Sequence, residues 1–366
     1  MRILVAPDKF RGTLTGRQAA EAIETGWRRE RPGDRLDLVP LADGGEGTLE
    51  ALVARDAGRR IRRSVIGPLG GTVEAEAGIR GSTGVVEMAR ASGLELLAAE
   101  HRDPLRATTR GTGELMAAVL AEGVSTLLVC LGGSATNDGG VGMASALGGR
   151  FLDASRHPIT DGGAALVQLA SIDVGPVLDV VRTVEVVALT DVDNPLCGPS
   201  GASAVFGPQK GASADDVLLL DRALGHLAAV AARDLGVDHS REAGAGAAGG
   251  LGYGLLAFTG ARLRPGVEIV MEVVGFEQRI RAADLVITGE GSLDAQSLHG
   301  KVPSGVMEAA RAAGVPVAIL CGVASVQPED AMVRSLVDRV GIDAALNDAR
   351  RSLELLAQEL ALEIGR

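Results

Sequence analysis

The side chains best suited to chemistry in this sequence are three lysines, and each lies in a turn marked by glycine. They are Lys9 in DKFRGT, Lys210 in GPQKGA and Lys301 in HGKVPSG, and every other member of the 36 basic residues is arginine. Lysine carries a compact ammonium that can follow a moving phosphate, whereas arginine offers a planar fork. Lysines kept in turns rich in backbone N–H groups therefore predict anion sites. The simpler alternative is three loop positions that tolerate lysine.

The loop GGSATNDGG at 132–140 combines glycines with small hydroxyl, amide and acidic side chains. It follows an expected strand at 126–131 and precedes an expected helix at 141–147. Backbone amides in such a strand–loop–helix turn surround a phosphate or carboxylate. We predict that this loop binds an anion, with a structural turn as the alternative. The residues assigned to binding here are Gly132, Gly133, Ser134, Thr136, Asn137 and Asp138.

Three further loops place carboxylates after expected strands. Asp43 lies in LADGGEGT, Asp191 in TDVDNPLCG, and Glu290 and Asp294 in ITGEGSLDAQSLHGKVPSG. Open α/β sheets bind ligands at the carboxyl ends of their strands. A carboxylate there can accept a proton or bind magnesium. Asp191 is the candidate base with Asp43 second, and Glu290 and Asp294 are candidate metal ligands. Helix caps and Asx-turns are the structural alternatives.

Two side chains in these loops are assigned to substrate or phosphate binding. Asn194 follows Asp191 in the same loop, and His299 precedes Lys301. An isolated histidine in a loop is more often a surface residue, so its assignment depends on its neighbours. Lys9 and Lys210 are assigned to the same role, while Lys301 is placed with the catalytic residues.

The segment GAGAAGG at 244–250 contains the pattern GxGxxG. In dinucleotide-binding folds this pattern follows a strand and precedes an acidic residue by about twenty positions. The preceding VDHSREA is not typical of a buried strand, so dinucleotide binding is not predicted. The glycines indicate either an anion site at a helix N-terminus or a tight turn.

The elements that must position these loops alternate between strand and helix. Strands are expected at 3–6, 36–41, 284–288, 316–320 and 342–346. Five parallel strands with helices on both faces make a doubly wound α/β sheet.

The middle of the chain differs from its ends, because short strands at 63–67, 72–78 and 84–88 indicate an antiparallel meander. We expect one domain at 1–61 plus 266–366, interrupted by an inserted α/β domain with a mixed sheet at 62–265. Two sequential domains are the alternative.

Composition narrows the class of protein. A chain of 366 residues favours two domains. A net charge of −11 disfavours nucleic acid and anionic membranes as partners. No run of 18 apolar residues occurs. The three cysteines lie far apart and show no metal-binding spacing, which argues against a structural zinc site. Three unpaired cysteines are typical of a protein in a reducing cytoplasm. We expect a cytoplasmic enzyme with a local positive patch or a magnesium ion for any anionic substrate.

Taken together, six motifs resemble the bacterial glycerate kinase family, in the same order from residue 1 to about residue 350. The motifs are APDKFRGTLT, DGGEGT, GGSATNDGG, TDVDNPLCGP, FGPQKGA and TGEGSLDAQSLHGKVP. The resemblance implies ATP-dependent phosphorylation of D-glycerate to 2-phosphoglycerate, assisted by Mg²⁺. It also implies a flavodoxin-like domain interrupted by a domain with a restriction-endonuclease-like fold.

The first motif departs from the family pattern. Arg11 stands where the family usually has lysine, and Lys9 stands where it often has serine. Arginine can still bind a phosphate or carboxylate in bidentate fashion. Arg11 is therefore assigned, with Lys301, to the substrate carboxylate or the ATP phosphates.

The resulting hypothesis is a kinase with its active site in a cleft between two domains. The alternatives are a glycerate kinase that forms 3-phosphoglycerate, an NAD-dependent hydroxyacid oxidoreductase, and a non-catalytic sensor of small acids. A homodimer is left open.

Overall fold

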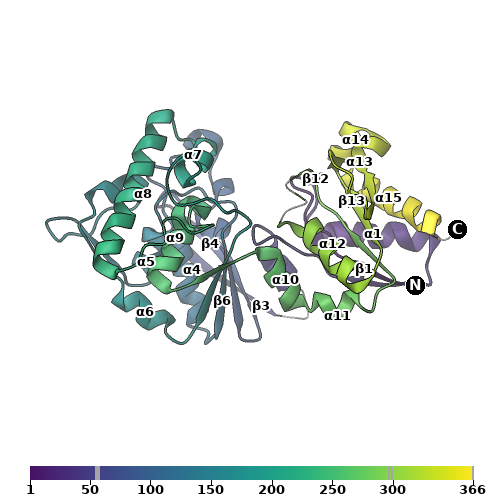
Figure 1. Cartoon of the computed structure of the whole chain (residues 1–366), viewed down its shortest axis with the longest axis horizontal. Coiled ribbons are helices and arrows are strands. Elements are labelled where there is room, and N and C mark those ends of the chain that lie inside the picture. The colour runs from purple at the N-terminus through teal and green to yellow at the C-terminus, as the bar shows by residue number, and fades with distance from the viewer. Residues whose placement is uncertain (54–57, 296, 298–299, 365–366) are drawn as a thin grey trace. The chain divides into compact units, whose positions relative to one another are not determined.

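The structure is a computed structural model that describes residues 1–53, 58–295, 297 and 300–364. The chain divides into two compact units, Met1–Asp43 with Pro265–Arg366, and Gly44–Arg264. Residues 44–61 thus belong to the second unit. Each unit contains its own sheet flanked by helices, which confirms the α/β class (Figure 1).

The first unit is built on a parallel sheet. Its strands are β1 (Arg2–Val5), β2 (Arg35–Leu38), β11 (Leu285–Thr288), β13 (Val317–Cys321) and β15 (Ala331–Ser335). Their order is β15-β13-β11-β1-β2, and all neighbours are parallel. The chain builds outward from β1 in one direction to β2 and in the other to β11. Open α/β sheets bind ligands beside such a reversal, outside the carboxyl ends of the strands.

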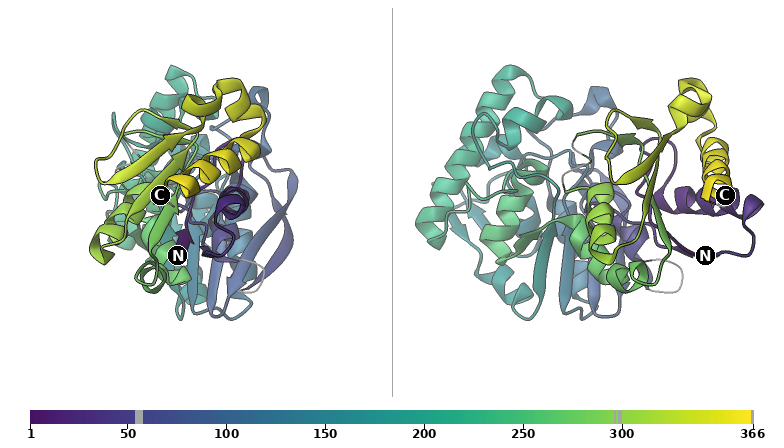
Figure 2. Two further views of the ribbon diagram at one scale, coloured as in Figure 1. Left: turned by 90° about the vertical axis from the view of Figure 1, so that its right-hand side faces the viewer. Right: turned by 45° about the vertical axis from the view of Figure 1, so that its right-hand side comes forward.

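Helices cover both faces of this sheet because successive strand residues point to opposite sides. Ile3 and Val5 share a core with α1 (Gly16–Glu30) and α15 (Ala349–Ile364), which lie side by side in both views of Figure 2. On the other face, α12 packs on β11 and β13 and contacts two further helices. The helices of that face are α10 (Gly266–Val274), α11 (Phe276–Ile280) and α12 (Val302–Ala313).

The prediction of the fifth strand was wrong. The strand is β15 (Ala331–Ser335), inside the segment 328–338, for which the spacing of apolar residues predicts a helix. The expected strand at 342–346 is the helix α14 (Ile342–Asn347). The sequence IDAALN contains alanine and leucine, which favour helix. The strand pairs with β13 over its full length, so tertiary pairing overrides the helical spacing of its apolar residues. A short helix, α13 (Leu336–Val340), joins the two elements, and β12 (Ser292–Leu293) pairs with β14 (Val323–Ala324).

The second unit contains a mixed six-stranded sheet in the order β10-β9-β6-β5-β4-β3. The expected meander is confirmed, because β3, β4 and β5 pair antiparallel, whereas β5, β6, β9 and β10 run parallel. The strands are β3 (Arg59–Ile66), β4 (Thr72–Arg80), β5 (Thr83–Glu87), β6 (Thr126–Cys130), β9 (Glu185–Leu189) and β10 (Arg262–Arg264). A separate antiparallel pair joins β7 (Arg150–Leu152) to β8 (Ser171–Asp173).

The helices of the second unit pack around one aliphatic core with few aromatic rings. They are α2 (Thr48–Leu52), α3 (Ala89–Ser92), α4 (Arg110–Leu120), α5 (Val141–Ala146), α6 (Gly175–Val181), α7 (Ala202–Phe206), α8 (Ala214–Leu235) and α9 (Ala247–Thr259). Short 3₁₀-helices lie at Leu94–Leu96, Ala99–His101, Gly163–Gln168 and Pro208–Lys210. Among the described residues, none of the helices combines the length and apolar character needed to span a membrane.

Candidate active site

In the first unit, backbone hydrogen bonds tie together the loops that leave the strands. The amide of Asp8, just after β1, donates to the Gly289 carbonyl after β11 at 2.8 Å. The amide of Leu41, after β2, donates to the Pro7 carbonyl at 3.0 Å. These bonds fix the loops at the carboxyl edge, beside the reversal of strand order.

Four carboxylates gather at this edge, and we call them the carboxylate cluster: Asp8, Asp43, Glu290 and Asp294. Burial, together with the charge of Asp43, raises the pKa of Asp8 to about 7, although the Lys9 ammonium opposes the shift. Burial also raises the pKa of Glu290, helped by Asp294 and Asp43. Like charges disfavour ionisation of their neighbours. The cluster therefore suits a positively charged ligand.

The structure brings together five residues that the sequence assigned to the site. They are Asp43, Glu290, Asp294, Lys9 and Lys301, each of which influences Asp8 or Glu290 electrostatically.

Sequence reasoning missed Asp8, which is only 6% exposed and accepts a hydrogen bond from the Lys9 amide at 2.6 Å. The rule that selected Asp43, a carboxylate shortly after a strand, also fits Asp8. Arg11 is exposed and its amide lies close to Gly291. His299 lies outside the described residues.

The carboxylate cluster fits a magnesium ion that also binds phosphate oxygens. Among the described residues, no three His, Cys, Asp or Glu side chains form a metal site by themselves. Mg²⁺ usually keeps several waters and binds one or two carboxylates together with substrate phosphates. One oxygen of Glu290, Oε1, is buried without a hydrogen-bond partner in the described part of the chain. Such an oxygen is suited to a cation.

In the second unit, two glycine motifs meet. A Cβ added to Gly132 would lie 2.6 Å from the Cα of Gly45, and one added to Gly133 would lie 2.6 Å from Oε1 of Glu46. Gly133 is exposed, with a φ of +73°. Neither of these loop glycines donates a backbone hydrogen bond to another described residue. Their amides can therefore bind an anion at the start of the 132–140 loop.

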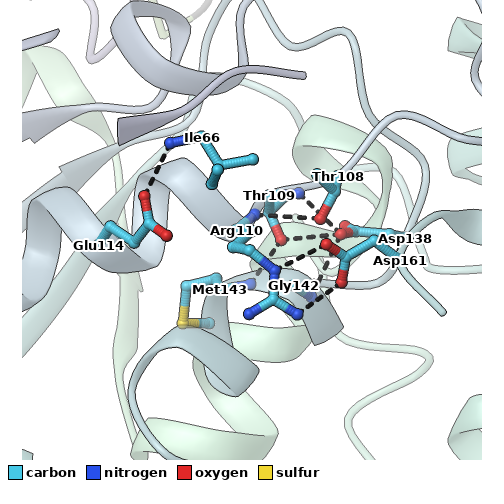
Figure 3. A network of polar contacts seen from close by, with 9 residues as sticks. All are labelled: Ile66, Thr108, Thr109, Arg110, Glu114, Asp138, Gly142, Met143 and Asp161. Carbon is cyan, nitrogen blue, oxygen red and sulfur yellow. Dashed lines mark hydrogen bonds and ion pairs between the residues drawn. The ribbon is translucent and has the colours of Figure 1, made fainter. Parts of the chain in front are cut away.

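Asp138 organises the far end of this loop (Figure 3). Its Oδ2 accepts hydrogen bonds from the Thr109 amide at 2.8 Å and the Thr109 hydroxyl at 2.9 Å. Its two oxygens also accept from the amides of Gly140 and Gly142 at the start of α5. Burial raises the pKa of Asp138, and these hydrogen bonds oppose the shift. In this structure Asp138 joins the N-termini of α4 and α5, so its binding role stays a prediction.

Asn137 and Lys210 are also held inside the second unit. The Asn137 amide group donates through Nδ2 to the Ser203 hydroxyl at 2.9 Å. Lys210 is 1% exposed, and its Nζ donates to the Thr136 carbonyl at 2.7 Å. Both contacts support the 132–140 loop from within. Direct contact of these side chains with a ligand stays a prediction.

The pKa of Lys210 yields a prediction about stability. Burial lowers this pKa from 10.5 to about 7, while Asp138 acts in the opposite direction. Between pH 7 and 10.5 the unfolded chain binds more protons than the folded one, so the free energy of unfolding rises with pH. Between pH 7 and 8.5, the free energy of unfolding of the parent protein should rise by roughly 1–2 kcal/mol more than that of the Lys210→Met variant. Urea titrations of both proteins measure the difference, and parallel pH profiles would contradict it.

The glycines at 244–250 form a tight turn. Ala248, Gly249 and Gly250 adopt left-handed conformations, and the Gly246 amide donates to the Asn194 carbonyl. A Cβ on Gly249 would lie only 1.9 Å from the Thr136 carbonyl oxygen. These contacts favour the tight-turn interpretation over the anion site.

This packing predicts that Gly249→Ala destabilises the protein by about 3–5 kcal/mol, because a steric clash adds to the strain of a positive φ. Gly260→Ala is the matched control, since Gly260 has the same φ of +68° but no neighbouring atom within 4 Å of an added Cβ. It should cost only about 1–2 kcal/mol. Urea denaturation compares the two, and equal losses would show that the contact with Thr136 is unimportant.

The loop at 190–198 leaves the carboxyl end of β9. Asp191 is exposed there. Asn194 donates through Nδ2 to the Ser200 carbonyl at 2.7 Å, so it also holds the loop itself. The structure thus gives Asn194 a supporting role and leaves the carboxylate of Asp191 accessible to solvent.

The chain is an α/β protein whose loops carry a carboxylate cluster, suited to a cation, and glycine amides, suited to an anionic group. The family model described as "Glycerate kinase family" matches residues 3–364. A glycerate kinase from Bacillus subtilis (strain 168) is 48% identical, with 100% of this chain and 98% of that protein covered. The glycerate 2-kinase of Escherichia coli (strain K12) is 46% identical over 95% of this chain and 90% of that protein.

A crystal structure provides a third comparison. The protein provisionally named glycerate kinase 2 in Salmonella typhimurium LT2 has a TM-score of 0.89 and 44% identity, covering 100% of this chain and 98% of that one. The chain therefore belongs to the glycerate kinase family. It is a phosphotransferase by family.

Proposed function

We propose that this enzyme transfers the γ-phosphoryl group of ATP to D-glycerate and forms 2-phosphoglycerate. The observation that carries the proposal is the gathering of Asp8, Asp43, Glu290 and Asp294 beside two lysines, at the edge where open α/β sheets bind ligands. The family match supports glycerate as the substrate, and the Escherichia coli relative supports the 2-position. The strand order of the first unit supports a flavodoxin-like domain, and we propose a restriction-endonuclease-like fold for the inserted one.

In this proposal the carboxylate cluster serves the metal and the phosphates. Glu290 and Asp294 would hold Mg²⁺, which would supply positive charge to the phosphate oxygens. Lys9 and Lys301, with Arg11, bind phosphate or the substrate carboxylate. Phosphoryl transfer depends mainly on positioning and charge stabilisation, so mobile lysine ammonium groups suit this role.

The second unit supplies the remaining groups. The amides of Gly132 and Gly133 bind an anionic group, and Asp191 accepts the proton of the glycerate hydroxyl. The LADGGEGT motif contributes to both sets, because Asp43 belongs to the carboxylate cluster and Glu46 lies against Gly133.

The test is an assay of ADP formation with ATP, magnesium and D-glycerate. Glycerate-dependent ADP release supports the kinase, and L-glycerate serves as the control for configuration. Glycerate binding without ADP release would favour the sensor. A change in nicotinamide absorbance without ATP would favour the oxidoreductase, which the tight turn at 244–250 does not support.

A further inference from the structure

Lys210 places an amino group in the interior of the second unit. It is one of three lysines in the chain, and it is 1% exposed at the end of a short 3₁₀-helix. Burying an amino group away from water is unfavourable unless it is hydrogen-bonded. A residue kept at such a cost needs a partner, and the partner is the Thr136 carbonyl, 2.7 Å from Nζ and 74 positions away in the sequence.

The contact with Thr136 also determines the direction of the next amide. A trans peptide unit is planar, so its C=O and N–H groups point in opposite directions. Because Lys210 holds the Thr136 carbonyl, the Asn137 N–H points away from the lysine. This N–H donates no hydrogen bond to any other described residue. The Asn137 side chain is held separately by the Ser203 hydroxyl.

The surroundings leave the Thr136 peptide little freedom. Gly249 packs so closely that a Cβ there would lie 1.9 Å from the Thr136 oxygen. The Thr136 hydroxyl is 3.4 Å from the Ala248 carbonyl. The carbonyl is thus confined on one side by the 248–249 turn and held on another by Lys210. Both contacts act on the loop whose first amides, at Gly132 and Gly133, have no acceptor among the described residues.

We propose that Lys210 is a positioning residue that holds the 132–140 loop in the conformation needed to bind a phosphate or carboxylate group of the substrates. The proposal rests on the proposed function, in which this loop binds an anion. It predicts that loss of the Nζ donor impairs the reaction without unfolding the protein. Replacing a buried charge by an apolar side chain of similar length is often neutral or stabilising.

The experiment compares Lys210→Met, which removes the donor, with Lys210→Gln, which retains one. Steady-state kinetics with ATP, magnesium and D-glycerate give kcat and both KM values, and urea titration gives the unfolding midpoint. For Lys210→Met we expect a midpoint at or above the parent value at pH 7 and a kcat/KM about 100-fold lower. Lys210→Gln should recover part of this loss. A role limited to folding would lower the midpoint and leave the kinetics of the folded fraction unchanged, which would overturn the proposal.

Gly133→Ala separates this proposal from the proposed function. If Gly133→Ala impairs catalysis and a folded Lys210→Met has normal kcat and KM, the loop binds the anion but Lys210 does not position it. If neither variant changes the kinetics, the 132–140 loop does not bind an anionic group of the substrates. That role of the loop in the proposed function is then wrong. If Lys210→Met fails to fold, Lys210→Gln decides: impaired kinetics at an unchanged midpoint support the proposal, and normal kinetics overturn it.

Discussion

Replacing Asp8 by asparagine should lower kcat about 10³-fold, because a preorganised charge beside the transferred group is lost. The same change should leave the free energy of unfolding unchanged or raise it. Asp8 is buried beside Asp43 and Glu290, and both raise its pKa. Removing one of several adjacent negative charges relieves repulsion. Asparagine can still accept the hydrogen bond from the Lys9 amide.

Opposite effects on activity and stability identify a residue whose charge serves the reaction. Steady-state kinetics and urea titration of the same preparation measure both. Asp330→Asn is the matched control, since Asp330 is an exposed carboxylate of the same unit that pairs with Arg311. It should change neither quantity appreciably. A destabilised Asp8→Asn enzyme with normal turnover would mean that Asp8 supports the fold only.

Replacing Asp191 by asparagine should lower kcat by about 10²–10⁴-fold with little change in the KM for ATP. Asparagine keeps the size of the side chain and removes its ability to accept the hydroxyl proton. Asp191 is exposed after β9, so the free energy of unfolding should stay within about 0.5 kcal/mol. The control is Asp238→Asn, another exposed carboxylate of the second unit.

A pH profile of kcat extends the test of Asp191. Loss of a base should remove the acidic limb of the profile, whereas a purely electrostatic role should lower kcat at every pH by the same factor. Turnover near the parent value would exclude Asp191 as the base and direct the search to Asp43.

Local chemistry was predictable where one loop carries several signals. Glycine, hydroxyl and acidic residues after the strand at 126–130 indicated a turn that joins β6 to α5, and the structure contains that turn. Asp43 and Glu290 were selected because each follows a strand, and their charges meet at Asp8. The positions of β1, β2, β11 and β13 were predictable because apolar runs between turn residues are a local property.

Burial and the partners of side chains were not predictable. Lys210 lies in a glycine-marked turn like Lys9 and Lys301, yet it is fully buried against Thr136. That contact joins residues 74 positions apart, so no local pattern contains it. The strand β15 was missed for a similar reason, because its pairing with β13 decides its conformation. Asp8 was missed because its burial beside Asp43 and Glu290 depends on contacts between distant parts of the sequence.

The most direct measurement is NMR of the product formed from ATP, magnesium and ¹³C-labelled D-glycerate. We predict a phosphorus resonance split into a doublet by the single proton on C2, which identifies 2-phosphoglycerate, together with one ADP per product. A resonance split into a triplet by the two protons on C3 would show the 3-phosphoglycerate alternative. The absence of any phosphorylated glycerate would contradict the proposed reaction altogether.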